Sequence, residues 1–111
     1  MPRHSRALTG TFTGTDRQRW YPPAVEQRYR ELGCWTDELI GDAPRRWARD
    51  TPDAPAVTDA DGTVTYAELE DRVARLASGF AEQGIDVGDR VVLQLGNRVR
   101  FIEVFLALQR L

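Results

Sequence analysis

The sequence contains no lysine, because all fifteen of its basic residues are arginine. It therefore lacks the ammonium group that a Walker-type phosphate loop, a Schiff base or a lysine-assisted adenylation step requires. It also has a single histidine, His4, and a single cysteine, Cys34. One residue of each kind cannot form a histidine-based catalytic pair, a Cys/His zinc site or an internal disulfide.

The chain has no apolar stretch of membrane-spanning length, and its first residues do not lead into the apolar core of a signal peptide. Together with the unpaired cysteine, this predicts a cytoplasmic location and no membrane partner. Fifteen basic and seventeen acidic residues give a formal charge of -2, and the basic residues are scattered. This pattern argues against a nucleic-acid partner.

The composition favours one modest globular domain, since 41% of the 111 residues are hydrophobic and 29% are charged. Residues 1–19 are rich in Thr, Gly, Ser and Arg without a periodic apolar pattern. We expect them to form a flexible leader. Residues 20–111 are the expected folded part.

The folded part is predicted to begin with a short helix, Val25–Leu32, that ends at Gly33. Trp20, Tyr29 and Trp35 flank or belong to this segment. We interpret these aromatic residues as a packing clamp, and a binding groove is the alternative. Cys34 is interpreted as an inert small apolar residue rather than a reactive thiol, because no second cysteine accompanies it.

A second helix is predicted from Ala43 to about Asp50, capped by Asp42 and anchored by a buried Trp47. Two short strands, Ala56–Thr58 and Thr63–Thr65, should then form a hairpin. The connecting residues include Asp59 and Asp61, which faintly resemble a metal-binding loop. Because the remaining oxygen ligands are missing, we interpret this segment as a turn.

Thr65 and Glu68 have the spacing of a capping box, in which a hydroxyl and a carboxylate satisfy the free N–H groups at a helix start. This interpretation is favoured over a catalytic pair. Apolar residues then recur at steps of three and four, which predicts an amphipathic helix from Tyr66 to about Gln83. Gly84 is expected to terminate it in a left-handed conformation.

The run Val91–Leu95 is almost wholly apolar and lies between turn residues, which predicts a strand covered on both faces in a parallel sheet. Asn97 is then expected to cap a last helix that is apolar on nearly all sides. Arg98 and Arg100 oppose the dipole of that helix. We expect them to be solvated, and pairing with acidic groups outside this chain is the alternative. The chain stops at Leu111 without a terminating residue, so we expect an incomplete domain.

These segments together resemble the acyl-adenylating superfamily, which contains acyl-CoA ligases, luciferases and the adenylation domains of peptide synthetases. Val64–Leu69 resembles the first core motif of that family. Further similarity lies at family-like distances in Gly84-Ile85, Gly88–Val91, Gln94–Asn97 and Leu108–Leu111. The resemblance implies an α/β fold, namely the start of the large N-terminal domain of an adenylate-forming enzyme. Residues 20–111 would be a truncated portion of that domain.

Within the superfamily, Trp20, Arg28–Trp35 and Gln94–Asn97 resemble the 2,3-dihydroxybenzoate and salicylate adenylating ligases of siderophore biosynthesis. The resemblance implies adenylation of an aryl acid with ATP and Mg2+, followed by transfer to an aryl carrier protein. The implied partners are that carrier protein and the remainder of the adenylation domain.

No catalytic, cofactor-binding or metal-binding residue of the family can be assigned to a position in this chain. We therefore expect the segment alone to be structural and inactive. One alternative is a fragment of another acyl-CoA ligase or of a peptide-synthetase adenylation domain. A second alternative, from a different class, is a non-enzymatic docking module that uses its apolar last helix.

Overall fold

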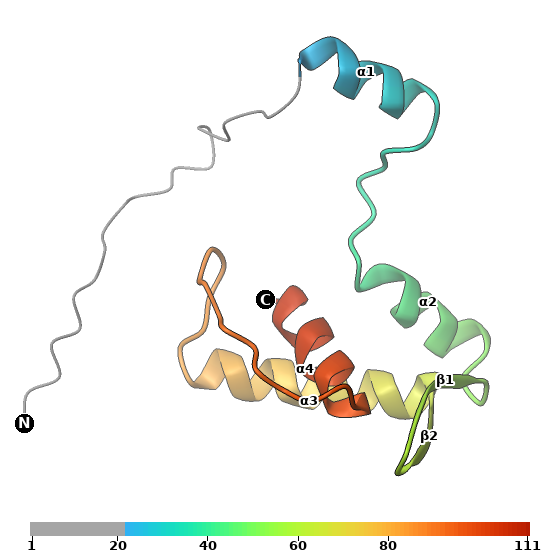
Figure 1. Cartoon of the computed structure of the whole chain (residues 1–111), viewed down its shortest axis with the longest axis vertical. Coiled ribbons are helices and arrows are strands. Elements are labelled where there is room, and N and C mark those ends of the chain that lie inside the picture. Colours follow the sequence, from blue (N-terminus) through green and yellow to red (C-terminus); the bar gives the residue numbers. More distant parts are fainter. Residues whose placement is uncertain (1–21) are drawn as a thin grey trace, which may run out of the picture. The chain divides into compact units, whose positions relative to one another are not determined.

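The computed structural model describes residues 22–111, so the expected leader 1–19, His4 and Trp20 lie outside the described residues. Contacts divide the chain into two compact units, Met1–Thr36 and Asp37–Leu111. Figure 1 traces the elements along the chain. The described residues contain helices α1 to α4 and a two-stranded sheet, which makes the fold α/β, as predicted.

The described part of the first unit contains helix α1 (Pro23–Glu31). Its proline start suits the first helical turn, where a missing N–H leaves no bond unmade. Gly33 follows the helix with a φ of 71°, a left-handed conformation that favours glycine. The predicted glycine stop is confirmed. The rings of Tyr29 and Trp35 stack with centroids 5.2 Å apart, and Cys34 is exposed.

The second unit begins with α2 (Asp42–Asp50), whose cap differs from the prediction. Gly41 is the N-cap residue, and the Asp42 carboxylate instead accepts a hydrogen bond from the Leu39 N–H at 2.8 Å. The prediction that Trp47 is buried is wrong, because this residue is 42% exposed. Its ring contacts Tyr66 at a centroid distance of 5.4 Å, so one face packs while the rest meets solvent.

The predicted hairpin is confirmed by strands β1 (Pro55–Asp59) and β2 (Gly62–Thr65), which pair antiparallel. Asp59 lies opposite Gly62 in the register. Inside the turn, the Asp59 carboxylate accepts a hydrogen bond from the Asp61 N–H at 2.8 Å. This side-chain-to-backbone bond is characteristic of turns and accounts for the aspartate that the sequence places there.

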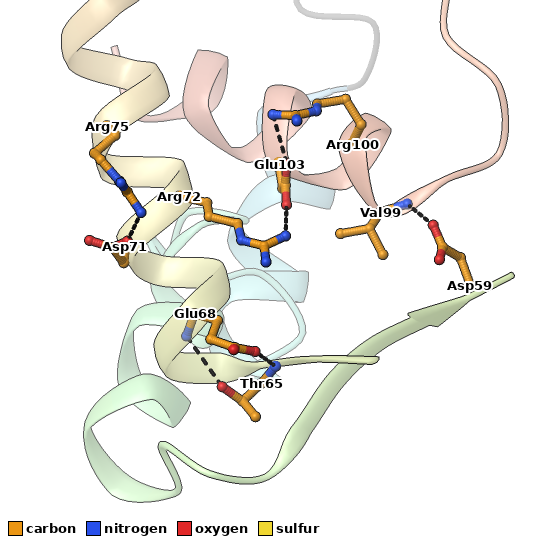
Figure 2. Close-up of polar contacts among 9 residues, drawn as sticks. All are labelled: Asp59, Thr65, Glu68, Asp71, Arg72, Arg75, Val99, Arg100 and Glu103. Atoms are coloured by element: carbon orange, nitrogen blue, oxygen red, sulfur yellow. Dashed lines mark hydrogen bonds and ion pairs between the residues drawn. The ribbon is translucent and has the colours of Figure 1, made fainter. Parts of the chain in front are cut away.

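Helix α3 (Tyr66–Glu82) begins at the predicted capping box. The Glu68 N–H donates to the Thr65 hydroxyl at 3.3 Å, and the Glu68 carboxylate accepts from the Thr65 N–H at 2.9 Å (Figure 2). At the other end, Gly84 has a φ of 87°. Local chemistry therefore sets both ends of this helix, as the sequence predicts.

The core of the second unit forms where α3, the hairpin and α4 (Val99–Gln109) meet. These elements contribute one apolar face each, and α3 and α4 cross over one another in Figure 1. The buried apolar residues are Val64, Leu69, Val73, Ala77, Val99, Leu106 and Ala107. The core is small, and several apolar side chains of α4, among them Phe101 and Val104, are only partly covered.

The predicted strand Val91–Leu95 is absent from the described structure, which contains only the β1–β2 sheet. Val92 is 93% exposed, so the prediction that both faces are covered is also wrong. A parallel strand needs neighbouring strands to bond its backbone, and the described residues offer none at this place. Among residues 22–111, no helix is both long and apolar enough to cross a membrane.

The capping box gives a direct prediction for stability. Replacing Thr65 with Ala removes the acceptor for the Glu68 N–H and should lower the free energy of unfolding of the 111-residue chain by about 1 kcal/mol. Thr65→Ser keeps the hydroxyl and should cost only a few tenths of that amount. Urea denaturation followed by circular dichroism measures both, and equal losses in the two variants would contradict the cap.

Candidate functional site

A buried carboxylate lies at the centre of the α3–α4 contact. Glu103 is only 1% exposed, although it is surrounded by the apolar residues of α4. A buried charge is costly unless it is paired and hydrogen-bonded. The groups around Glu103 therefore decide whether it is a reactive residue or a structural one.

Two arginines from different helices neutralise Glu103. Arg72 of α3 donates from Nη1 to Oε1 at 3.0 Å, and Arg100 of α4 approaches Oε2 with its Nη1 at 3.3 Å (Figure 2). The hydrogen bond to Glu103 raises the pKa of Arg72. Burial lowers this pKa and so offsets part of the rise, whereas the negative charge of Glu103 adds to it. Each oxygen of the buried carboxylate is thus occupied by a permanent cation.

A second carboxylate, Asp59, joins the hairpin to the start of α4. Its Oδ2 accepts a hydrogen bond from the Val99 N–H at 2.9 Å (Figure 2). Its Oδ1 accepts a hydrogen bond from the Asp61 N–H at 2.8 Å. These two backbone bonds, the one to Val99 foremost, lower the pKa of Asp59, and the positive charge of Arg98 adds to the effect. Asp59 therefore caps a helix that starts forty residues later in the sequence.

The structure corrects one prediction about the start of α4 and extends another. Asn97 does not cap the helix: the N-cap residue is Arg98, which makes no side-chain cap bond. Arg98 and Arg100 are exposed, as predicted, and they also pair: Arg98 contacts Asp61 at 2.9 Å and Arg100 contacts Glu103. Both acidic partners belong to this chain, and they offset the unfavourable helix dipole.

The cluster borders an open cavity of about 380 Å³ between the hairpin turn and α4. Its lining combines carboxylates and guanidinium groups, principally Asp59, Asp61, Arg72, Arg98, Arg100 and Glu103. Within residues 22–111, every buried side-chain polar atom has a hydrogen-bond partner. A carboxylate with both oxygens occupied is poorly placed to take a proton from a substrate. The geometry therefore supports a structural junction here.

A larger open groove of about 690 Å³ lies between α2 and α3. Asp42, Arg45, Arg46 and Arg49 line its α2 side, and Glu70 and Asp71 line its α3 side. The three positive and three negative groups balance and are partly paired: Arg45 lies 3.9 Å from Glu70, which also contacts Arg110, the residue after α4, at 2.7 Å. Outside the groove, a hydrogen bond to Glu38 raises the pKa of Arg46. This groove has no net charge that would select an anion or a cation.

The side chains of residues 22–111 are not grouped in a way that fits Mg2+ or the phosphates of ATP. Across the described part of the chain, no three His, Cys, Asp or Glu side chains converge in a way that would hold a metal ion. The sequence also offers no lysine for a phosphate group. We therefore derive no catalytic step through these groups from the residues present.

The roles of Glu103 and Arg72 were not predicted from the sequence. A usable signal was present, because Glu103 is the one acidic residue inside the apolar run from Phe101 to Leu108. An acidic residue on an otherwise apolar helix predicts a buried ion pair. Arg100, three positions away on the same helix, has the spacing of a pair, but the second partner could not be read from the sequence, because Arg72 lies 31 positions away and on a different helix.

A comparison with protein families identifies the family of this chain. The model of the AMP-binding enzyme family matches residues 44–111, which include most of α2 and the whole of the hairpin, α3 and α4. The chain belongs to the AMP-binding enzyme family. The resemblance of the Val64–Leu69 region and its following turns to acyl-adenylating enzymes is thereby confirmed.

Two curated relatives of this chain are 2,3-dihydroxybenzoate-AMP ligases. It is 41% identical over 96 residues to the vibriobactin-specific 2,3-dihydroxybenzoate-AMP ligase of Vibrio cholerae, covering 86% of this chain and 18% of the relative. It is 43% identical over 91 residues to the 2,3-dihydroxybenzoate-AMP ligase of Bacillus subtilis, covering 82% and 17%. The chain thus spans less than a fifth of the length of these relatives.

A solved structure has the same arrangement of elements. The apo structure of Mycobacterium smegmatis MbtA matches this AMP-binding family chain with a TM-score of 0.74 and 43% identity. The match covers 79% of this chain and 17% of the solved one. The described elements therefore match one part of that larger structure.

The Glu103 cluster predicts unequal effects for two arginines on α3. Arg72→Met leaves the buried Glu103 with one cation and should lower the free energy of unfolding clearly, since an unpaired buried charge is costly. Arg75→Met is the matched control, one turn along α3, because Arg75 pairs only with the exposed Asp71 and such pairs are worth about 0.2–1 kcal/mol. Glu103→Gln should cost about 1–3 kcal/mol. Equal losses for Arg72→Met and Arg75→Met in urea denaturation would rule out the cluster as a stabilising contact.

The Asp59 cap predicts a dependence of stability on pH. Because its pKa is lower in the folded chain than in the unfolded one, Asp59 contributes stability above its unfolded pKa of about 3.9. That contribution is lost as the pH falls through the folded pKa. Asp59→Asn should therefore be less stable than the parent chain at pH 5–8, and the difference should shrink below about pH 4. Urea midpoints measured from pH 3 to 7 test this, and a constant difference over that range would refute it.

Proposed function

We propose that residues 20–111 form the N-terminal portion of the AMP-binding domain of an aryl acid–AMP ligase, following a leader of residues 1–19. The observation that carries this proposal is the identity of 41–43% with two 2,3-dihydroxybenzoate-AMP ligases over more than four-fifths of the chain. The similarity to the solved adenylating enzyme supports the same placement within a larger fold.

The proposed reaction of the whole protein has two steps. The carboxylate of 2,3-dihydroxybenzoate or salicylate attacks the α-phosphate of ATP with Mg2+ present, which forms the aryl adenylate and releases pyrophosphate. The thiol of a phosphopantetheine group on an aryl carrier protein then attacks the adenylate carbonyl, which forms a thioester and releases AMP. We place this activity in siderophore biosynthesis, in the cytoplasm.

The contribution of this chain to that activity is structural. Its buried carboxylate is neutralised by two arginines and its helix start is capped by Asp59, so its charged groups hold α3, α4 and the hairpin together. The groups that bind ATP, Mg2+ and the aryl acid belong, in this proposal, to the remaining part of the domain. The chain alone is accordingly expected to be inactive.

A chimeric enzyme tests the proposed function. In the B. subtilis ligase, the segment that matches this chain is replaced by residues 20–111. The chimera should catalyse ATP–pyrophosphate exchange that depends on 2,3-dihydroxybenzoate or salicylate, because the substituted segment supplies only scaffold. The 111-residue chain alone should catalyse none.

Two controls accompany this experiment. The B. subtilis ligase with the matched segment deleted should be inactive. Reactions without 2,3-dihydroxybenzoate or salicylate give the background rate of exchange. A chimera that folds, judged by circular dichroism, but shows no exchange with either acid would contradict the proposal. Exchange by the isolated chain would contradict the structural role.

A further inference from the structure

A third open groove lies along α3 and reaches Arg100 of α4; we call it the arginine groove. Its volume is about 470 Å³, and its lining on α3 extends from Arg72 to Gln83. At 1.5 Å of rise per residue, this lining is about 16 Å long, which is about three helical turns. The arginine groove therefore has the length to accommodate a segment of another helix.

The floor of the arginine groove is apolar. Leu76 and Phe80 pack against the core of the second unit but are only partly buried, and both line the groove. Apolar surface that is left in water gains free energy when a partner covers it. The floor is therefore suited to apolar side chains of a partner.

Gly79 lies between these two residues on α3 and also lines the groove. Glycine in the interior of a helix costs stability, and a Cβ atom added at Gly79 would meet nothing within 4 Å. Packing among the described residues therefore does not require a glycine at this position. A missing side chain lets another backbone approach the helix closely.

The rim of the arginine groove is positive. Arg72, Arg75 and Arg100 line it, and none of the described residues in its lining is acidic. Glu103 balances only one of the two charges of Arg72 and Arg100, so this trio keeps one net positive charge. Arg75 pairs with Asp71, but their side chains are 73% and 61% exposed, so exchanging Asp71 for another carboxylate costs little. Unlike the balanced groove between α2 and α3, the arginine groove selects an acidic occupant.

We propose that the arginine groove is a docking site for an acidic amphipathic helix of a partner protein. Apolar side chains of that helix pack on Leu76 and Phe80, its backbone passes close to Gly79, and one of its carboxylates contacts Arg75. Arginine and aromatic residues are enriched at interfaces between proteins, whereas the interior of a domain is mainly apolar. The lining therefore favours a separate protein over the remaining part of the same domain. This proposal does not rest on the proposed function.

The test measures the binding of a synthetic acidic helix to the 111-residue chain by fluorescence anisotropy. The probe is a fluorescein-labelled peptide that repeats Glu-Leu-Glu-Glu-Leu-Leu-Glu three times, which places its leucines on one helix face. The control peptide has Gln in place of every Glu. The acidic peptide should bind at least ~10-fold more tightly than the control, and its affinity should fall as NaCl rises from about 0.05 to 0.5 M, because salt screens the attraction.

Three variants locate the binding. Arg75→Glu reverses one charge in the arginine groove, and Arg49→Glu makes the same change in the groove between α2 and α3. Arg75→Glu should weaken binding at least ~10-fold, whereas Arg49→Glu should weaken it less than ~2-fold. Gly79→Leu obstructs the floor and should also weaken binding at least ~10-fold, while the urea midpoint of the chain should not fall, because leucine is the better helix former.

The same peptide is also titrated into the B. subtilis ligase that carries residues 20–111, in which the rest of an AMP-binding domain is present. Its affinity should stay within ~3-fold of that for the isolated chain, since a docking site for another protein remains open. Binding to the isolated chain but not to a folded chimera would show that the domain covers the groove, and would overturn the proposal.

Three further results would overturn it: no binding of the acidic peptide, equal binding of the two peptides, or unchanged binding by Arg75→Glu and Gly79→Leu. The proposed function fails separately. A chimera that binds the peptide but catalyses no pyrophosphate exchange would remove only the aryl-acid activity. An active chimera that does not bind the peptide would remove only the docking site.

Discussion

The pairing of Glu103 with Arg72 and Arg100 is the contact on which the arrangement of the second unit depends. It places a fully buried negative charge between two helices that otherwise meet through apolar side chains. Apolar contacts tolerate sliding, whereas a buried carboxylate has to keep its cations within hydrogen-bonding distance. The Asp59 bond to the Val99 N–H adds a second directional contact and ties the hairpin to the same end of α4. Two carboxylates therefore fix three elements around a small core.

This use of charge explains how the polar clusters among residues 22–111 serve a structural junction. Arg72, Arg100 and the Val99 N–H are groups that could have held a phosphate or a carboxylate ligand, but acidic side chains of the chain itself already occupy them. The apolar segment 91–95 and the partly covered face of α4 have no such partners within the described residues. The described residues therefore combine satisfied polar contacts with apolar side chains that stay uncovered, in a chain of the AMP-binding enzyme family that spans less than a fifth of the length of two relatives.

Features governed by near neighbours could be predicted from the sequence. The capping box at Thr65, the left-handed Gly84 and the turn between the two strands each depend on residues a few positions apart, and all three are confirmed. Features governed by distant partners could not. Asn97 has the chemistry of a cap, but Asp59, brought there by the hairpin, takes that role. The strand at 91–95 fails for the same reason, since its pattern is correct for a strand and its pairing partners are not among the described residues. The spacing of Arg72 and Glu103 gave no hint of their contact.

The central claim is that this chain is a scaffold portion of an aryl-acid adenylating ligase. The most direct measurement is the loading of an aryl carrier protein by the B. subtilis ligase into which residues 20–111 have been substituted, followed by intact-protein mass spectrometry. The account predicts that the phosphopantetheine-bearing carrier gains the mass of one aryl acyl group when ATP and 2,3-dihydroxybenzoate or salicylate are supplied. A folded substituted enzyme that leaves the carrier unmodified with both acids, under conditions in which the parent ligase loads it, would contradict the claim.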